Sequence, residues 1–411
     1  MRAVARQEGV PLSLVVRGVA SGRIVIPRNP RRGGEVAVRG IGEGLCTKVN
    51  ANVGTSPDYV NVEEEVKKAK VAERYGADAV MDLSIGGDLD LVRRRILREV
   101  NLPVGTVPVY QAVVEASKRG SPMDLSPDDL FNTIRRQARD GVDFMTVHCG
   151  VTRSLAERLK GKRVLGVVSR GGAFLLAWML KQGKENPLYE EFDYLLEIAA
   201  EYDLTLSLGD GMRPGSLGDA SDYFQLQELL TLGRLVERAR EKGVQTMVEG
   251  PGHLPLDQVE WNVKLEKAVC KGAPFYVLGP VVTDLAPGYD HLVGAIGGAV
   301  AGMAGADFLC YVTPSEHLCL PSVEDVKEGV IAAKIAAHVA DVAKGRGWER
   351  ELEMGRARRE LDWEKQFRLS LYPEKAMRLR KERPPRLDPQ TCSMCSKFCV
   401  LRFLGEMLKG L

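Results

Sequence analysis

Three cysteines lie close together near the C-terminus, in the stretch TCSMCSKFCV. Cys392, Cys395 and Cys399 have the spacing C-x2-C-x3-C. Three thiols cannot all pair with one another as disulfides, and the polar, arginine-bearing start of the chain lacks the apolar run of an export signal. We therefore expect a cytoplasmic protein, in which clustered cysteines indicate metal binding or catalysis.

The number and order of these cysteines favour an iron–sulfur cluster over zinc. A structural zinc ion usually takes a fourth Cys or His close by, and the C-terminal tail has none. Three thiolates on a [4Fe–4S] cluster leave one iron without a protein ligand. That iron can bind the amino and carboxylate groups of S-adenosylmethionine (SAM), and electron transfer to SAM then yields a 5′-deoxyadenosyl radical. The spacing reverses the common radical-SAM order, in which three residues precede two.

Two histidines follow glutamates at the ends of expected strands. His253 closes the motif EGPGH, and His317 closes TPSEH. Two imidazoles with open coordination positions suit a catalytic Zn or Fe ion. His338 lies among alanines in a helical stretch, so we expect it to be structural. A second interpretation stays open, a zinc-dependent hydrolase in which these two histidines are catalytic and the clustered cysteines are structural.

Glycine-rich turns follow other expected strands. VSRGG can wrap an anion with glycine amides, a hydroxyl and a guanidinium, or it can be an ordinary turn before a helix. GDGMRPG puts Asp210 and Arg213 in one turn, where they can orient a polar ligand or pair with each other. Because the strands of a βα barrel end at one mouth, we expect such residues to converge there.

The elements that must position these residues alternate between short β-branched runs and amphipathic helices, from about residue 45 to 315. This alternation predicts an α/β fold, a (βα)8 TIM-type barrel. Nine runs, RVLGVVSRGG among them, are strand candidates where the barrel needs eight, so one is misassigned or lies outside it. We expect an N-terminal lead-in, a catalytic barrel, a C-terminal helical region and a cluster-binding tail: residues 1–44, 45–320, 321–384 and 385–411.

The composition is that of an ordinary globular protein. The chain has 411 residues, is 45% hydrophobic and carries a net charge of +2. This charge is too small to predict binding to nucleic acid or to an anionic membrane surface. No apolar stretch reaches the roughly 20 residues needed to span a bilayer. We therefore expect a small-molecule ligand and neither a nucleic acid nor a membrane partner.

Long motifs along the chain resemble the ThiC family of radical-SAM enzymes. They are KVNANVGTSP, GTVPVYQA, VSRGG, SLGDGMRPG, MVEGPGHLPLD, APFYVLGP, APGYDH, LCYVTPSEH and LDWEKQF, and the similarity runs from about residue 14 to the cysteines. The resemblance implies the same barrel, and a homodimer in which a flexible cysteine loop reaches the partner chain's active site. It also implies aminoimidazole ribotide (AIR) as the substrate, and the radical chemistry needs an electron donor.

The resemblance assigns roles to the residues that match the family's motifs. The three clustered cysteines would hold the [4Fe–4S] cluster and, with Glu249, act in catalysis. His253 and His317 would hold an additional divalent metal, Zn or Fe. AIR would be bound by Asn50, Met81, Tyr110, His148, Ser169, Arg170, Gly171, Asp210, Arg213, Glu249 and Tyr276.

Four departures from the family's usual motifs bear on the product. PRNPRR stands in place of PANxNH, Ile85 replaces a threonine, Gly294 loses a hydroxyl, and Cys319 is added after a predicted metal ligand. Lost hydroxyls at a polar mouth can redirect a radical rearrangement. These departures favour 5-hydroxybenzimidazole, a cobalamin lower-ligand precursor, as the product. The alternatives are 4-amino-5-hydroxymethyl-2-methylpyrimidine phosphate for thiamin biosynthesis, and a paralogous partner subunit without catalysis.

Overall fold

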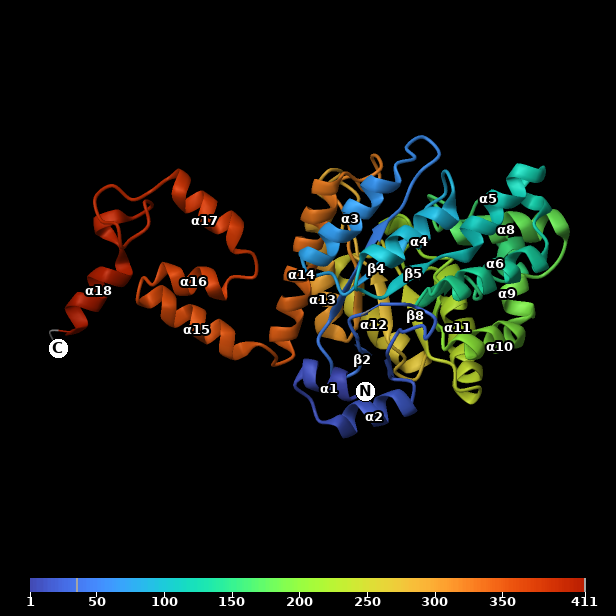
Figure 1. The fold of residues 1–411 in the computed structure, drawn as a ribbon, viewed down its shortest axis with the longest axis horizontal. Helices are drawn as coiled ribbons and strands as arrows, with labels where there is room; N and C mark the ends of the chain where they lie inside the picture. The colour runs from blue at the N-terminus through green and yellow to red at the C-terminus, as the bar shows by residue number, and fades with distance from the viewer. Residues whose placement is uncertain (35, 410–411) are drawn as a thin grey trace. The chain divides into compact units, whose positions relative to one another are not determined.

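Eight parallel strands close into a barrel in the computed structural model, which describes residues 1–34 and 36–409. The first barrel strand, β3, pairs with β4 on one side and with the last strand, β10, on the other. The predicted (βα)8 TIM-type fold is confirmed (Figure 1). The strands are β3 (Lys48–Val53), β4 (Ala79–Asp82), β5 (Val104–Thr106), β6 (Phe144–Val147), β7 (Thr205–Leu208), β8 (Thr246–Gly250), β9 (Phe275–Leu278) and β10 (Phe308–Cys310).

Helices connect the strands and cover the outside of the barrel (Figure 1). Many begin at a side chain that caps the helix: Asn61, Asp88 and Ser126 each accept a hydrogen bond from the amide three residues later. The helices of this part are α3 (Val62–Arg74), α4 (Leu89–Glu99), α5 (Pro108–Arg119), α6 (Pro127–Asp140), α7 (Arg153–Arg158), α8 (Arg170–Gln182), α9 (Pro187–Glu190), α10 (Phe192–Tyr202), α11 (Tyr223–Glu241), α12 (Leu256–Val269), α13 (Asp290–Ala304) and α14 (Val323–Ala343), with short 3-10 turns at η1 (Pro122–Asp124) and η2 (Leu217–Asp219).

One of the nine strand candidates, RVLGVVSRGG, lies outside the barrel: residues 163–169 belong to the connection between α7 and α8, and residues 170–172 begin α8. The backbone amides of Val164 and Leu165 donate to the Asp219 carboxylate at 2.7 and 2.9 Å, where strand residues would bond to a neighbouring strand. Both side chains are exposed. The segment is rich in β-branched residues, as strands are, but its backbone amides bond to a side chain and not to a neighbouring strand. Periodicity alone cannot distinguish these two cases.

The N-terminal segment packs as a small structure of its own. It comprises α1 (Arg2–Glu8), α2 (Leu12–Ala20) and an antiparallel pair of short strands, β1 (Ile24–Val25) and β2 (Ile41–Gly42). A separate apolar cluster, with Val4, Val15, Ile24 and Leu45 among its buried residues, holds these elements together. The predicted lead-in is therefore a folded element.

Part of this segment also binds the starts of the barrel strands. The Arg32 guanidinium is buried, pairs with the Asp143 carboxylate just before β6, and donates to the Leu97, Val100 and Leu102 carbonyls. The backbone amide of Asn29 donates to the Asp143 carboxylate at 3.0 Å. Residues 29–32 thus fix the end of the barrel opposite to the carboxyl ends of its strands.

The compact unit that contains the barrel extends to Asp341, so α14 belongs largely with the barrel. Asp341 accepts hydrogen bonds from the amide and hydroxyl of Thr47, directly before β3. Residues from 342 onward form a second unit. Among the described residues, no helix is both long and apolar enough to cross a bilayer. The second unit contains α15 (Trp348–Arg359), α16 (Trp363–Leu369), α17 (Pro373–Glu382), η3 (Ser396–Phe398) and α18 (Val400–Lys409).

Candidate active site

A cavity of about 280 Å³ lies at the carboxyl ends of the barrel strands. Every barrel strand, or the loop that follows it, contributes at least one lining residue. Active sites of such barrels lie at this end because the loops there are free to vary without disturbing the core. Eight of the residues predicted to bind AIR line the cavity: Met81, Tyr110, His148, Arg170, Asp210, Arg213, Glu249 and Tyr276.

The other three predicted AIR ligands lie directly behind the lining. The buried Asn50 amide donates to the Tyr276 hydroxyl at 2.7 Å and so orients it. Ser169 caps α8 by accepting a hydrogen bond from an amide of its first turn. A Cβ atom on Gly171 would lie 2.3 Å from Cε1 of His148, so only glycine leaves room for this imidazole. The three residues support the lining from behind.

Glu249 is held by two hydroxyl groups inside the barrel. Thr146 and Ser207 each donate to its Oε1 atom at 2.6 Å. Burial raises the pKa of Glu249 to about 8, and the negative charge of Asp210 adds to the shift. A carboxyl group with such a pKa can give or take a proton near neutral pH, which is what general acid–base catalysis requires.

Asp210 and Arg213 form an ion pair in the turn after β7. Oδ1 of Asp210 lies 3.0 Å from Nη1 of Arg213. Burial raises the pKa of Asp210, although the guanidinium opposes this. The two side chains therefore pair with each other, one of the two alternatives that the sequence left open. Both also line the cavity, where they present polar atoms to it. The charges of Asp210 and Glu249 act on each other, so the two carboxyl groups share one electrostatic environment.

His148 is a neutral imidazole in this cavity. Burial lowers its pKa to about 3, and the positive charge of Arg213 adds to the effect. Its Nδ1 atom has no hydrogen-bond partner among the described residues. A buried ring nitrogen without a partner costs free energy, because it has lost its hydrogen bond to water.

Tyr110 and Arg170 form another part of the cavity wall. The Arg170 guanidinium lies 4.9 Å from the centroid of the Tyr110 ring, and Phe174 meets the same ring edge-on. Burial raises the pKa of Tyr110, which keeps the phenol neutral and able to donate a hydrogen bond. This part of the wall thus offers a cation and a hydroxyl to the cavity.

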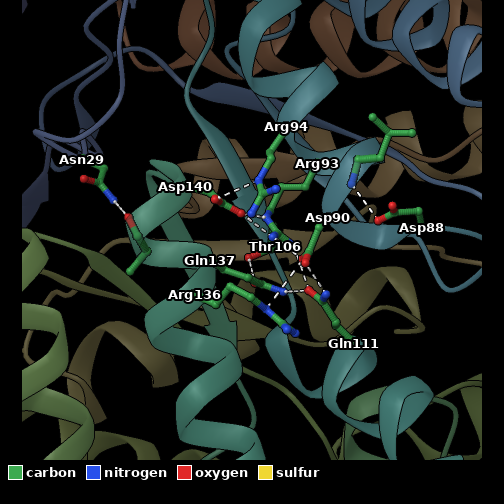
Figure 2. Close-up of polar contacts among 12 residues, drawn as sticks. Asn29, Asp88, Asp90, Arg93, Arg94, Thr106, Gln111, Arg136, Gln137 and Asp140 are labelled. Carbon is green, nitrogen blue, oxygen red and sulfur yellow. Dashed lines mark hydrogen bonds and ion pairs between the residues drawn. The ribbon is translucent and has the colours of Figure 1, made fainter. Parts of the chain in front are cut away.

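A buried polar network supports Tyr110 from outside the barrel, between β5, α4, α5 and α6 (Figure 2). Oε1 of Gln111 accepts hydrogen bonds from Arg93 at 2.7 Å and from Gln137 at 2.8 Å. Thr106, the last residue of β5, donates to Gln137 at 2.6 Å. Because Gln111 follows Tyr110 directly, these bonds fix the first turn of α5 and with it the Tyr110 ring.

His253 and His317 lie close enough to share a metal ion, with ring centroids 5.1 Å apart. Nδ1 of His253 lies 2.7 Å from the Asp284 carboxylate, and Nδ1 of His317 lies 3.2 Å from that of Asp290. Carboxylates on Nδ1 leave both Nε2 atoms for a metal, the usual arrangement of metal-binding histidines. The donor set therefore fits the predicted divalent ion.

These two imidazoles would be the metal ligands that the protein itself supplies. In the part of the chain that the structure describes, no three His, Cys, Asp or Glu side chains are arranged to hold a metal. Cys319 is exposed and does not join the pair as a third donor. The remaining coordination positions would be left to water or substrate, as in catalytic metal sites.

Removing the carboxylate behind one histidine tests this site. Asp284→Asn is expected to weaken Zn²⁺ binding about 10–100-fold, because the carboxylate orients the imidazole and raises its basicity. The measurement is a calorimetric Zn²⁺ titration of protein whose three clustered cysteines are changed to serine. Glu260→Gln, which removes an exposed carboxylate paired with Lys264, is the matched control. Equal affinities in the two variants would contradict the assignment.

The three clustered cysteines lie in the second unit, where the backbone after Cys392 forms tight turns. The Ser396 amide donates to the Cys392 carbonyl at 3.1 Å, and the Phe398 amide to that of Cys395 at 2.9 Å. The amides of Cys395 and Met394 lower the pKa of the Cys392 thiol. A thiol that ionises easily suits an iron ligand. The segment fits a cluster chemically, although the described side chains are not gathered as a ligand set; residues 410–411 of the predicted tail lie outside the described residues.

None of the residues at the four sequence departures lines the cavity. Ile85 packs against the barrel core, and Gly294 is buried on α13. Cys319 is exposed. The motif PRNPRR, residues 27–32, contributes the contacts to Asp143 at the opposite end of the barrel. The residues that line the cavity are therefore unaffected by these departures.

The sequence does not single out several residues of the site. Thr146 lines the cavity and, with Ser207, holds Glu249. Cys310 also lines it, and the Asn52 amide donates to its sulfur at 3.1 Å. The sequence could have pointed to Thr146, because it precedes the predicted ligand His148 by two positions. Residues two apart in a strand lie on the same face. No sequence signal marks Cys310, because a residue that packs in the core and one that lines a cavity look alike in a strand.

A model of the radical SAM ThiC family matches residues 1–406. A protein named phosphomethylpyrimidine synthase from Methanocaldococcus jannaschii is 56% identical over 413 residues, which cover 100% of this chain and 96% of its own. One of the same name from Caldanaerobacter subterraneus subsp. tengcongensis is 58% identical and covers 99% and 95%. Phosphomethylpyrimidine synthase 2 from Methanothermobacter thermautotrophicus is 57% identical and covers 99% and 96%.

Solved structures give a weaker likeness. A dihydropteroate synthase from Coxiella burnetii has a TM-score of 0.44 and 14% identity, covering 74% of this chain and 96% of its own, which is too low to support a conclusion. The family model and the relatives, in contrast, span nearly the whole chain. The chain therefore belongs to the radical SAM ThiC family.

Proposed function

We propose that this chain converts AIR to 4-amino-5-hydroxymethyl-2-methylpyrimidine phosphate; its relatives are named for synthesis of a phosphomethylpyrimidine. The observation that carries the proposal is the cavity lining, which none of the four sequence departures enters. Those departures are the reason to expect 5-hydroxybenzimidazole. Since they do not touch the cavity, they give that product no structural support.

Membership of a radical SAM family implies an iron–sulfur cluster and SAM. We propose that Cys392, Cys395 and Cys399 hold a [4Fe–4S] cluster, which supplies the electron for SAM cleavage when it is bound. His253 and His317 would hold the additional divalent metal, Zn or Fe. The chemistry of these donors supports both assignments.

The chain's own residues would bind and orient AIR. Arg170 and Arg213 give the cavity positive charge that suits a phosphate. The neutral His148 and Tyr110 can hydrogen-bond to the ring and ribose without adding charge. Glu249, held by Thr146 and Ser207, holds a proton near neutral pH and can pass it to or from the substrate.

The partners and the setting of the protein are part of the same proposal. We propose a homodimer in which the cysteine segment of one chain serves the cavity of its partner, a cytoplasmic setting, and an external electron donor. Residues from 342 onward fold as a unit of their own, which is compatible with such an exchange. Sedimentation of the purified chain would test the dimer directly.

The product assay decides between the two reactions. Protein reconstituted with iron and sulfide under anaerobic conditions is given AIR, SAM and a strong reductant, and the products are identified by mass spectrometry. We expect the mass of the hydroxymethylpyrimidine phosphate, together with 5′-deoxyadenosine. The mass of 5-hydroxybenzimidazole would overturn the proposal, and formation of 5′-deoxyadenosine without either product would indicate another substrate.

A further inference from the structure

A second, small cavity of about 20 Å³ lies behind the main one. Asp210, Arg213 and Glu249 line both cavities. On its other side are Glu228 from α11 and Asn262 from α12. One ordered water needs roughly 10–15 Å³ and two to four polar partners. The small cavity has room for one water among polar groups.

Glu228 faces this small cavity and is not part of the main lining. Its side chain is buried, and its Oε2 atom accepts a hydrogen bond from the Met212 amide at 2.8 Å. Its Oε1 atom has no partner with hydrogen-bond geometry among the described residues, although the Gly211 amide lies close enough to the carboxyl group to oppose the rise of its pKa. A neutral carboxyl group at this position carries its proton on Oε1, because Oε2 already serves as an acceptor.

Three carboxyl groups, those of Asp210, Glu228 and Glu249, share this buried region. One guanidinium, that of Arg213, lines the small cavity with them. Burial raises the pKa of Glu228 well above its usual range, and the charge of Asp210 adds to this. Because three buried carboxylates beside one cation repel one another, the cluster keeps protons at neutral pH. The other titratable groups that act on Glu228 are Arg163, which is paired with Asp222, and the Cys149 thiol.

We propose that Glu228 stores a proton for the active site and passes it, through one water in the small cavity, to the pair formed by Asp210 and Glu249. The inference rests on the proposed function, since it concerns the same cavity. Glu228 does not reach the main cavity, so it is a positioning residue. Its bond to the Met212 amide also holds the turn that carries Asp210 and Arg213.

The transfer is a balanced movement of protons. Once Glu249 has given a proton to the substrate, the O–H bond at Oε1 of Glu228 breaks and its proton goes to the water. The water gives one of its protons to the Glu249 carboxylate and is itself unchanged. The negative charge ends on Glu228, where the Met212 amide stabilises it. No oxidant or reductant is consumed.

Two variants separate proton storage from support of the turn. Glu228→Gln keeps an oxygen for the Met212 amide but has no carboxyl proton, whereas Glu228→Ala loses both. Calorimetry of AIR binding in buffers of different ionisation heat gives the number of protons taken up with the ligand. The titration is repeated at increasing pH, and at the alkaline end, where part of the cluster is ionised, we expect proton uptake by the wild type because an anionic ligand raises the pKa of nearby carboxyl groups. E228Q should take up fewer protons at unchanged AIR affinity, and E228A should also lose affinity.

The stability of the protein without cluster or ligand provides a second readout. A carboxyl group whose pKa is higher in the native state than in the unfolded state stabilises the fold at low pH. This contribution is lost as the pH rises through the native pKa. The wild type should therefore lose more stability than E228Q between about pH 5 and 9. Equal proton uptake and equal pH dependence in the two proteins would overturn the inference. Failure of the wild type to bind AIR would instead contradict the proposed function, while the pH dependence would still test Glu228.

Discussion

Cys395→Ala is expected to abolish SAM cleavage while leaving AIR affinity unchanged. Two remaining thiolates cannot hold a cluster that needs three protein ligands and one open iron. The cavity lies in the other compact unit, so the substitution leaves its lining intact. The measurements are 5′-deoxyadenosine formation by chromatography and AIR binding by calorimetry, each on protein reconstituted with iron and sulfide.

Cys46→Ala is the matched control for this experiment. Cys46 lies shortly before the first barrel strand, outside the clustered segment. Its loss should change neither iron content nor SAM cleavage. Persistent 5′-deoxyadenosine formation by the Cys395→Ala protein would refute the cluster assignment, and stoichiometric zinc without iron or sulfide would favour the zinc-dependent hydrolase.

Asp143→Ala is expected to lower the free energy of unfolding by about 3–5 kcal/mol, because it leaves the buried Arg32 guanidinium without its counter-charge. Both side chains of this pair are almost fully buried. The Asp143 carboxylate also accepts hydrogen bonds from the amides of Asn29 and Val104. The substitution therefore removes both the ion pair and these two backbone contacts, and thermal unfolding should show a clear fall in Tm.

An exposed ion pair in the same N-terminal segment supplies the comparison. Glu43→Ala breaks the Arg23–Glu43 pair, whose side chains are 51% and 63% exposed, and should cost less than about 1 kcal/mol. Replacing both buried partners, Arg32→Met with Asp143→Leu, should recover part of the lost stability because no charge is then left unpaired. Similar Tm values for Asp143→Ala and Glu43→Ala would contradict the assigned role of the buried pair.

The barrel could be predicted because its strands are short buried runs that alternate with amphipathic helices. The N-terminal packing could not, since the partner of Arg32 is more than a hundred residues away in sequence and no local pattern joins them. Which of the nine strand candidates lies outside the barrel could not be predicted for a related reason. The bonds that hold Val164 and Leu165 come from the Asp219 carboxylate, which periodicity does not encode.

The candidate site could be predicted where its residues stand at strand ends. Met81, His148 and Glu249 follow that rule and line one cavity. Glu228 does not, because it lies in the middle of a helix, where a glutamate is normally a solvated surface residue. The sequence departures are also misleading, since a changed motif shows that a residue differs but not which way its side chain points.

The pairing of β3 with β10 has a consequence for how the protein is made. Val49 is paired in register with Leu309. The first barrel strand therefore cannot complete its pairing until the last one has left the ribosome. Until then β3 and β9 are open edges, and open edges of a sheet invite pairing with other chains. A message truncated before Phe308 would therefore yield an aggregation-prone product, and shielding of the nascent chain should matter most over the final stretch of barrel synthesis.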